Sequence, residues 1–329
     1  MSRLAPILQG FFAERLSIER RASPHTIASY RDTIRLLLNY LHTTSGTQPA
    51  KIDITQLDAP TITAFLEHLR RERGNSDSTS NTRLAAIHTL FRYAILRAPE
   101  HAELIARVLA IPPRKRQRPI VTYLTATETD ALIAAPNQHT WHGRRDRAIL
   151  QLATQTGLRA TELTHLNCHD VHLGKSAFVR CEGKGRKQRH TPLTRATTLT
   201  LTSWLQERGN HPEQPLTPTA TGRRLSRDAL ARIVNIHTTT ASATCSTLKT
   251  KNVTPHTLRH TAAMALLHAG IDTSVIALWL GHESPESTHA YLHADMTIKE
   301  RALARMHPND TTPNPYTAPD TLLAFLDSL

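Results

Sequence analysis

TPHTLRHTAAMALLHAGIDTSVIALWLGHESPESTHAYLH, residues 254–293, predicts three helices and a cluster of reactive side chains. His256 and Arg259 are three residues apart at the start of the first helical pattern, which places them on one face. His282 follows a glycine at the end of the second pattern, and Tyr291 lies nine residues further on in the third. Cationic side chains at helix ends beside a solitary phenol suit a phosphodiester and a nucleophile.

The start of the first helix has two interpretations. With Thr254 as N-cap and Pro255 at the first position, backbone N–H groups at the helix end could bind an anion. A capped surface helix with incidental basic residues would give the same pattern. The segment from Ala263 to His282 also resembles a helix-turn-helix with Gly270 at the turn, so a DNA-binding segment without chemistry is a second alternative.

The composition restricts the class of protein. A chain of 329 residues is long enough for two domains, and its net charge of +13 favours nucleic acid as partner, although an Arg-rich host proteome would give the same balance. No apolar run reaches the roughly 18 residues of a membrane helix, and the N-terminus has no signal-peptide cleavage site. Three cysteines without CxxC spacing argue against disulfides and structural zinc. We therefore expect a soluble, cytoplasmic, nucleoid-associated protein.

Residues 1–111 are expected to form a bundle of four or five short helices. The first clear helix begins with Ser23 as N-cap and Pro24 at its first position, and apolar residues recur near a 3.6-residue period as far as position 41. Residues 61–71 and 80–96 repeat the pattern. Basic residues on the polar faces are either solvated or directed at DNA. The candidate DNA contacts are Arg31, Arg35 and Arg83.

Residues 112–122 are expected to be a basic, extended and exposed linker, because PPRKRQRP opens and closes with proline. Such a strap could cross a duplex backbone through phosphate contacts, or it could only carry solubilising charge. The candidate DNA contacts are Arg114, Lys115, Arg116 and Arg118.

Residues 123–308 are expected to form a second, mostly helical domain with one β-hairpin over 176–193. Thr125 and Glu128 form a capping box, and a helix that starts near residue 144 stops at Gly157. Further helices are predicted over 194–208 and 225–237, an exposed Thr-rich loop over 238–252, and a flexible tail with a short apolar helix over 309–329. The fold class is mainly α (α+β).

Several residues of this domain could carry chemistry. Arg159 follows Gly157 at a tight turn, and Glu162 could orient a cation or merely cap a helix. Lys184 at the hairpin tip could be a general acid, although most tip lysines are only solvated. Tyr291 is a poor nucleophile at a pKa of about 10, but it becomes useful where guanidinium groups hold a phosphate and a base takes its proton. The hairpin also supplies two candidate DNA contacts, Arg186 and Lys187.

The chain resembles the tyrosine recombinases, the phage-integrase and Xer-like family, through TGLRATEL, GKGRKQR, HTLRH and LGH. SPHTIASYRDTIRLLLNYL is similar to the family's helical core-binding (SAM-like) domain, and the catalytic resemblance spans about 124–300. Six positions stand in the family's order: Arg159, Lys184, His256, Arg259, His282 and Tyr291.

The resemblance implies a metal-independent, cofactor-free mechanism. Tyr291 would attack a scissile phosphate, form a 3′-phosphotyrosyl bond and free a 5′-hydroxyl. Lys184 would protonate the leaving oxygen, and His256 would assist proton transfer from Tyr291. Glu162 would support the site by contacting catalytic residues and not the substrate. The residues that would hold the non-bridging oxygens are Arg159, Arg259 and His282.

The resemblance also implies partners: double-stranded DNA with short inverted-repeat recombination sites, a homotetramer on two sites, accessory proteins, and a C-terminal helix over 321–329 exchanged between protomers. We expect no arm-binding domain before the helical bundle, which favours a simple recombinase acting on short inverted repeats over an integrase that needs distant arm sites. We expect a role in moving a mobile genetic element, with Xer-like chromosome or plasmid dimer resolution as the alternative. Two alternatives are a non-catalytic helix-turn-helix regulator and a type IB topoisomerase-like enzyme.

Overall fold

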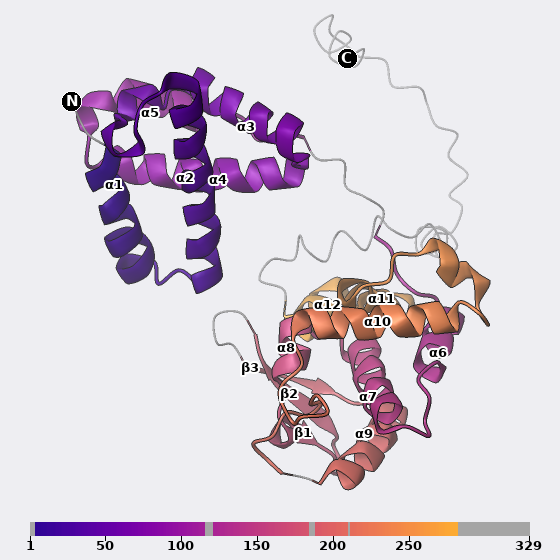
Figure 1. Ribbon diagram of the computed structural model, residues 1–329. Helices are drawn as coiled ribbons and strands as arrows, with labels where there is room; N and C mark the ends of the chain where they lie inside the picture. The colour runs from indigo at the N-terminus through magenta and orange to yellow at the C-terminus, as the bar shows by residue number, and fades with distance from the viewer. Residues whose placement is uncertain (1–3, 116–120, 184–187, 210, 282–329) are drawn as a thin grey trace, which may run out of the picture. The chain divides into compact units, whose positions relative to one another are not determined.

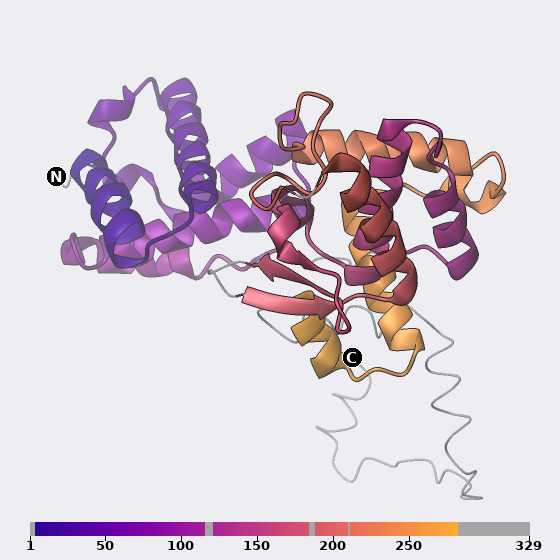
Figure 2. The ribbon, with the colours of Figure 1, turned by 90° about the horizontal axis from the view of Figure 1, so that it is seen from below.

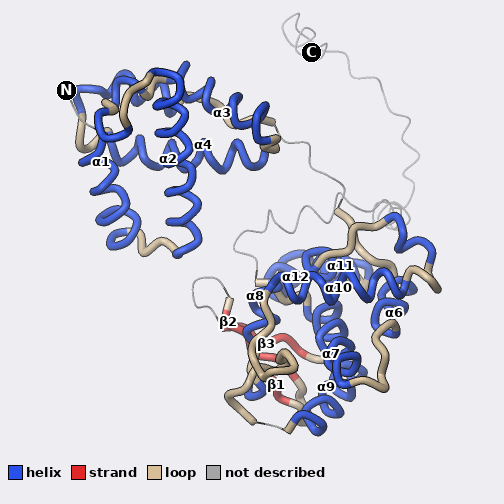
Figure 3. Tube along the Cα trace, in the orientation of Figure 1, coloured by secondary structure: helices blue, strands red, loops and turns tan. Residues whose placement is uncertain are grey.

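The computed structural model describes residues 4–115, 121–183, 188–209 and 211–281 (Figure 1). The chain divides into two compact units, Met1–Arg118 and Pro119–Leu329. The division falls inside the segment 112–122 that the sequence assigns to a linker. Helices dominate both units, and the strands form one small antiparallel sheet, which confirms the expected fold class (Figure 3).

The first unit is a bundle of helices around an apolar core. Ser23 caps its longest helix by accepting a hydrogen bond from the backbone N–H of Thr26, and Gly46 ends that helix with a positive φ of 71°. Phe11, Phe65 and other apolar side chains are fully buried between the helices. The elements are α1 (Leu4–Gly10), the π-helix η1 (Phe11–Glu19), α2 (Pro24–Ser45), α3 (Ala59–Arg73), α4 (Asp77–Ala94) and α5 (Ala102–Leu109), with 3-10 turns η2 (Pro49–Lys51), η3 (Ile54–Gln56) and η4 (Pro99–His101).

The start of the expected linker packs against the first unit. The Asn81 side chain in α4 accepts a hydrogen bond from the Arg114 backbone N–H (2.8 Å) and donates one to the Arg114 carbonyl (2.9 Å). The Arg114 guanidinium contacts the carboxylate of Glu67 in α3 at 2.7 Å. The expectation of a wholly exposed strap is therefore wrong for Arg114, because one amide side chain satisfies both of its backbone polar groups.

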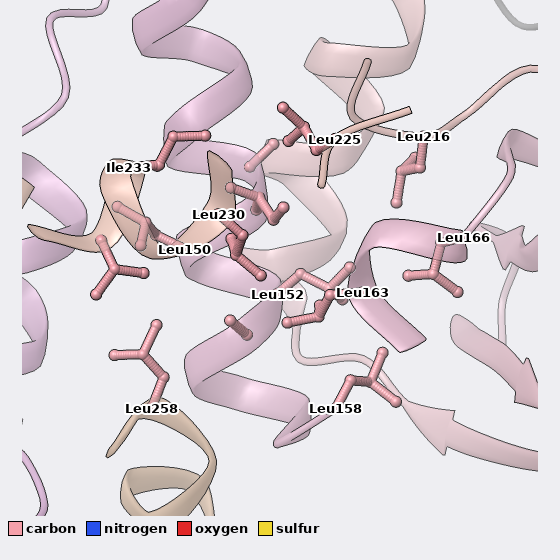
Figure 4. Packing of buried hydrophobic residues seen from close by; sticks show 14 of the residues in the cluster. Leu150, Leu152, Leu158, Leu163, Leu166, Leu216, Leu225, Leu230, Ile233 and Leu258 are labelled. Atoms are coloured by element: carbon pink, nitrogen blue, oxygen red, sulfur yellow. The ribbon is translucent and has the colours of Figure 1, made fainter. Parts of the chain in front are cut away.

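The second unit is built around α7 (Trp141–Thr156), which packs against α6 (Ala126–Ala134), α9 (Arg195–Arg208) and α11 (Pro255–His268). Leucines of these and neighbouring segments, Leu152 and Leu163 among them, fill the space around α7 (Figure 4). The other elements are α8 (Ala160–His165), α10 (Arg227–Ala241), α12 (Thr273–Leu280) and 3-10 turns η5 (Cys168–Asp170) and η7 (Ser246–Thr250).

The sheet lies to one side of these helices (Figure 2). The predicted hairpin is confirmed as β2 (Phe178–Glu182) paired with β3 (Gln188–Pro192), and a short strand β1 (Val171–His172), which the sequence did not reveal, pairs with β2. The register sets Cys181 opposite Arg189 and Val179 opposite Thr191. Because side chains alternate along a strand, Arg189 shares the inward face of β3 with the buried Thr191.

The Thr-rich segment 238–252 is not the exposed loop that its composition predicts. Helix α10 continues to Ala241, and Thr238 is buried on its inner face. The segment then forms η7, whose Leu248 enters the core. Lys251 reaches the carboxylate of Glu128 (2.6 Å) and the carbonyl of Tyr123 (2.9 Å). The segment is therefore ordered despite its polar composition, because its apolar residues recur at helical spacing and Lys251 pairs with Glu128.

Candidate active site

The N-terminus of α11 carries the first two candidate residues. Thr254 accepts a hydrogen bond from the Thr257 backbone N–H at 3.2 Å, and Pro255 occupies the first helical position, as predicted. His256 is exposed, and its ring packs edge-on against His260 with 4.1 Å between centroids. The Thr254 side chain thus caps the start of α11, while the imidazole of His256 faces outward.

Arg259, one turn further along α11, is buried with only 4% of its surface exposed. Its Nη1 donates to the Gly157 carbonyl at the end of α7 (2.7 Å) and its Nη2 to the Leu280 carbonyl at the end of α12 (2.9 Å). Helix ends leave carbonyls without intrahelical partners, and this guanidinium satisfies two of them. Arg259 therefore joins the start of α11 to the C-terminal ends of α7 and α12.

Arg159 approaches the same place from the N-terminus of α8. Its Nη2 donates to the Gly281 carbonyl at 2.9 Å, next to the carbonyl that Arg259 contacts. Its Nη1 and its backbone N–H donate to the two carboxylate oxygens of Glu162, at 2.9 and 2.7 Å. The Arg159 side chain is 35% exposed, so a bound anion could reach its guanidinium. Two arginines thus converge on consecutive carbonyls that immediately precede His282.

Arg189 in β3 is a component of this site that the sequence did not single out. Its Nη1 and Nη2 donate to the two Glu162 oxygens at 3.1 and 2.7 Å, and its side chain is only 12% exposed. The available signal was the alternation in β3, which puts position 189 on the inward face. The carboxylate partner could not be read from that alternation, because it lies 27 residues away.

The charges of the site act on its titratable groups. Burial alone would raise the pKa of Glu162, but hydrogen bonds and charge from Arg189, together with the hydrogen bonds of Arg159, hold it below its ordinary value. Although His256 is an exposed residue, the protein atoms around its ring displace solvent from it, and this effect together with the positive charges of Arg259 and Arg159 lowers its pKa. At neutral pH Glu162 is therefore an anion and His256 a neutral imidazole that can accept a proton.

Four of the predicted site residues are thus placed: Arg159, Glu162, His256 and Arg259. Lys184, His282 and Tyr291 lie outside the described residues, although the structure describes Gly281, the neighbour of His282. The other candidates outside the described residues are Arg116, Arg118, Arg186 and Lys187.

The candidate DNA contacts of the first unit differ in their surroundings. Arg31 and Arg35 lie 3.4 and 3.7 Å from the carboxylate of Asp32, and Lys115 is exposed. Arg83 is half-buried, and within the described part of the chain its guanidinium forms no hydrogen bond or ion pair; its Nε is fully covered. Burial and the positive charge of Arg73 lower the pKa of Arg83.

Both units match models of known protein families. Residues 122–297 match the model of the phage integrase family, and residues 10–98 match that of the phage integrase N-terminal SAM-like domain. The protein named "Putative integrase/recombinase y4rC" of Sinorhizobium fredii is 48% identical over 326 residues, which cover 99% of this chain and 98% of that protein. Tyrosine recombinase XerC of Pelobacter propionicus is 31% identical over 315 residues, covering 95% and 99%.

Solved structures share the fold. The XerH site-specific recombinase bound to a palindromic difH substrate superposes with a TM-score of 0.68 at 22% identity, covering 87% of this chain and 81% of that one. The Tn1549 transposon integrase in complex with a circular intermediate DNA gives the same TM-score at 15% identity, covering 91% and 99%. With both units matched in sequence and a full-length relative at 48% identity, this chain belongs to the phage integrase family of tyrosine recombinases.

Proposed function

We propose that the chain is a site-specific DNA recombinase that cleaves and rejoins DNA through a 3′-phosphotyrosine intermediate. The observation that carries the proposal is the convergence of Arg159 and Arg259 on the turn before His282. Preorganised guanidinium groups stabilise the charge that develops on a phosphate in the transition state. Family membership and the recombinase fold support the same conclusion.

The chemical step divides among the six candidate residues. The Tyr291 oxygen attacks the scissile phosphate and gives its proton to the neutral His256, while Lys184 protonates the leaving 5′-oxygen. Attack by the 5′-hydroxyl of a second strand reverses these transfers and releases Tyr291. The groups that hold the non-bridging oxygens are Arg159, Arg259 and His282. Glu162 orients Arg159 through the two hydrogen bonds described above.

The two units have separate tasks in this proposal. Residues 1–111 form the core-binding domain that grips DNA, residues 112–122 connect it, and residues 123–308 form the catalytic domain. The protein acts in the cytoplasm on nucleoid DNA as a homotetramer on two short inverted-repeat sites, with accessory proteins. The helix over 321–329, in the tail 309–329, passes to a neighbouring protomer. Among the described helices none is long and apolar enough to cross a bilayer.

We favour a role in moving a mobile genetic element over Xer-like dimer resolution. The solved Tn1549 transposon integrase shares the fold, but XerH does so equally, so the fold alone does not decide between the two roles. The y4rC relative, whose name gives integrase before recombinase, is more similar in sequence than XerC.

A covalent-adduct assay tests the catalytic proposal. Duplexes are first selected by the full-length protein from a random pool, then nicked near their centre so that the leaving strand diffuses away. We expect wild type to form an SDS-resistant protein–DNA adduct and Tyr291→Phe to bind the duplex equally well without forming it. If wild type forms no adduct, the chain is a DNA-binding regulator and the catalytic proposal is wrong. If Tyr291→Phe forms as much adduct as wild type, Tyr291 is not the nucleophile and the proposed mechanism is wrong.

Relaxation of supercoiled plasmid separates the recombinase from a topoisomerase. A recombinase should leave a plasmid without the selected sites supercoiled, whereas a type IB topoisomerase would relax it.

A further inference from the structure

The Glu162 carboxylate receives four N–H groups, two from Arg159 and two from Arg189. All four donor–acceptor distances lie between 2.7 and 3.1 Å. A carboxylate that accepts a bidentate guanidinium pair is held firmly in position and charge. Only 5% of the Glu162 side chain is exposed, so little water screens it. The three side chains therefore behave as one electrostatic group.

The charge of this group depends on Arg189. Two guanidinium cations and one carboxylate leave one net positive charge on the group. Without Arg189, the ionised Glu162 would neutralise Arg159, and the group would present no net charge to a phosphate. Since Arg159 is the more exposed of the two arginines, 35% against 12%, the surplus charge is available on the side that an anion can reach.

Arg189 also lies close to Gly281, the residue before His282. Gly281 has φ of +66°, and a Cβ added there would lie 2.7 Å from Nη1 of Arg189. The same guanidinium thus lies against Glu162 on one side and against the residue before His282 on the other. Any displacement of Arg189 would change both its pairing with Glu162 and its packing against Gly281.

We propose that Arg189 is a positioning residue of the reaction, which satisfies the Glu162 carboxylate so that Arg159 keeps its positive charge for the scissile phosphate. This inference rests on the proposed function, because it assumes that Arg159 contacts a reacting phosphate. Arg189 itself acts through Glu162 and does not touch the DNA. A purely structural role, in which Arg189 only fastens β3 to α8, makes different predictions for the double variant below.

The test compares Arg189→Met, Glu162→Gln, the double variant and the control Arg180→Met. Arg180 lies in β2 and pairs with Asp170 at 3.2 Å, so it is a matched arginine–carboxylate pair outside the site. The readouts are the rate of adduct formation on the selected nicked duplex at saturating protein, the affinity for the intact duplex, and the melting temperature. Arg189→Met should form adduct on the order of 10²-fold more slowly, since it cancels one charge-stabilising group.

The double variant gives the decisive result. Replacing a buried ion pair by neutral residues is tolerated far better than removing one partner. We expect Arg189→Met/Glu162→Gln to recover at least about tenfold of the lost rate, because no carboxylate then neutralises Arg159. Lowering the pH should have the same effect on Arg189→Met alone, whose rate relative to wild type should rise as Glu162 takes up a proton. Arg180→Met should match wild type.

Three results would overturn the inference. One is an Arg189→Met variant that cleaves at the wild-type rate; another is a double variant no faster than Arg189→Met, which would assign Arg189 a structural role only. If Arg189→Met does not fold, the folded double variant alone tests the inference. Adduct formation by the double variant on the order of 10²-fold slower than wild type would then contradict the positioning role of Arg189. Absence of any wild-type adduct removes the proposed function, and this inference falls with it.

Discussion

At the scale of single residues, the exposure and the pKa of each charged group in the site depend on the residues around it. Arg259 is buried because helix-end carbonyls take two of its five N–H donors, whereas Arg159 is only partly covered. Loss of solvent around the His256 ring and the nearby positive charges of Arg259 and Arg159 both disfavour a positive charge on its imidazole. The resulting low pKa leaves the imidazole able to take the proton that we propose Tyr291 gives up.

The titration of His256 follows from this arrangement. Its pKa should lie below the ordinary 6.5, and Arg159→Gln should raise it towards that value by removing one of the positive charges. A lowered pKa in the folded protein means that the unfolded chain binds more protons, so this group's contribution to stability is lost as pH falls below 6.5. Adduct formation should decline over the same acid range.

NMR titration of the imidazole Cε1–H resonances measures the effect directly. His88 provides an internal control, because burial lowers its pKa as well but Arg159 does not act on it. A His256 midpoint at or above 6.5 in wild type would contradict the prediction, as would an equal shift of His88 in Arg159→Gln.

At the scale of elements, local signals were readable and distant pairings were not. Ser23, Thr125 and Thr254 cap their helices as predicted, since a cap depends on residues three positions away. The hairpin followed from the strand-favouring Phe178 and Val179 and from the glycine turn after them. The partners of Arg259 lie 102 and 21 residues away, and Glu162, the partner of Arg189, lies 27 residues away, so no local pattern contains them. The sequence could therefore place the elements of the site but not the hydrogen bonds between them.

The ordered segment before α11 offers a stability test. Lys251→Met leaves the Glu128 carboxylate, 3% exposed, without its ammonium partner while Thr125 and Thr247 still donate to it. We expect a loss of about 2 kcal/mol in the free energy of unfolding, measured by urea denaturation.

The neighbouring Lys249 gives the matched control. It is exposed and forms no ion pair within the described residues, so Lys249→Met should change the free energy of unfolding by less than about 0.5 kcal/mol. Adding Glu128→Gln to Lys251→Met should restore part of the loss. Equal effects of the two lysine substitutions would show that the Glu128 pair contributes nothing specific.

At the scale of the whole molecule, a net charge of +13 supplies affinity for DNA in general, but the arginines do not contribute alike. Arg114 is already paired with Glu67, whereas Arg83 has no such partner among the described residues. A cation that must leave a carboxylate before it meets a phosphate gains little from the exchange. Arg83 is therefore the stronger candidate for a phosphate contact.

Salt-dependent binding separates the two arginines. Arg83→Met should weaken binding of the selected duplex and reduce the slope of log affinity against log salt concentration by about 1, the loss of one phosphate contact. Arg114→Met should leave that slope unchanged. Fluorescence anisotropy with a labelled duplex over a series of salt concentrations provides the measurement. If Arg114→Met reduced this slope and Arg83→Met left it at the wild-type value, the assignment would be reversed.

The pinning of Arg114 by Asn81 has a consequence for how the two units act on one DNA molecule. Counted along the sequence, the tether between them starts at Lys115 and not at Pro112, and it ends at Val121, which packs against the small apolar cluster of α11 and α12. When one unit has bound, a shorter tether keeps the other at a higher effective concentration near the same site. Asn81, which is not among the candidate DNA contacts, would thereby determine how rarely both units release DNA together.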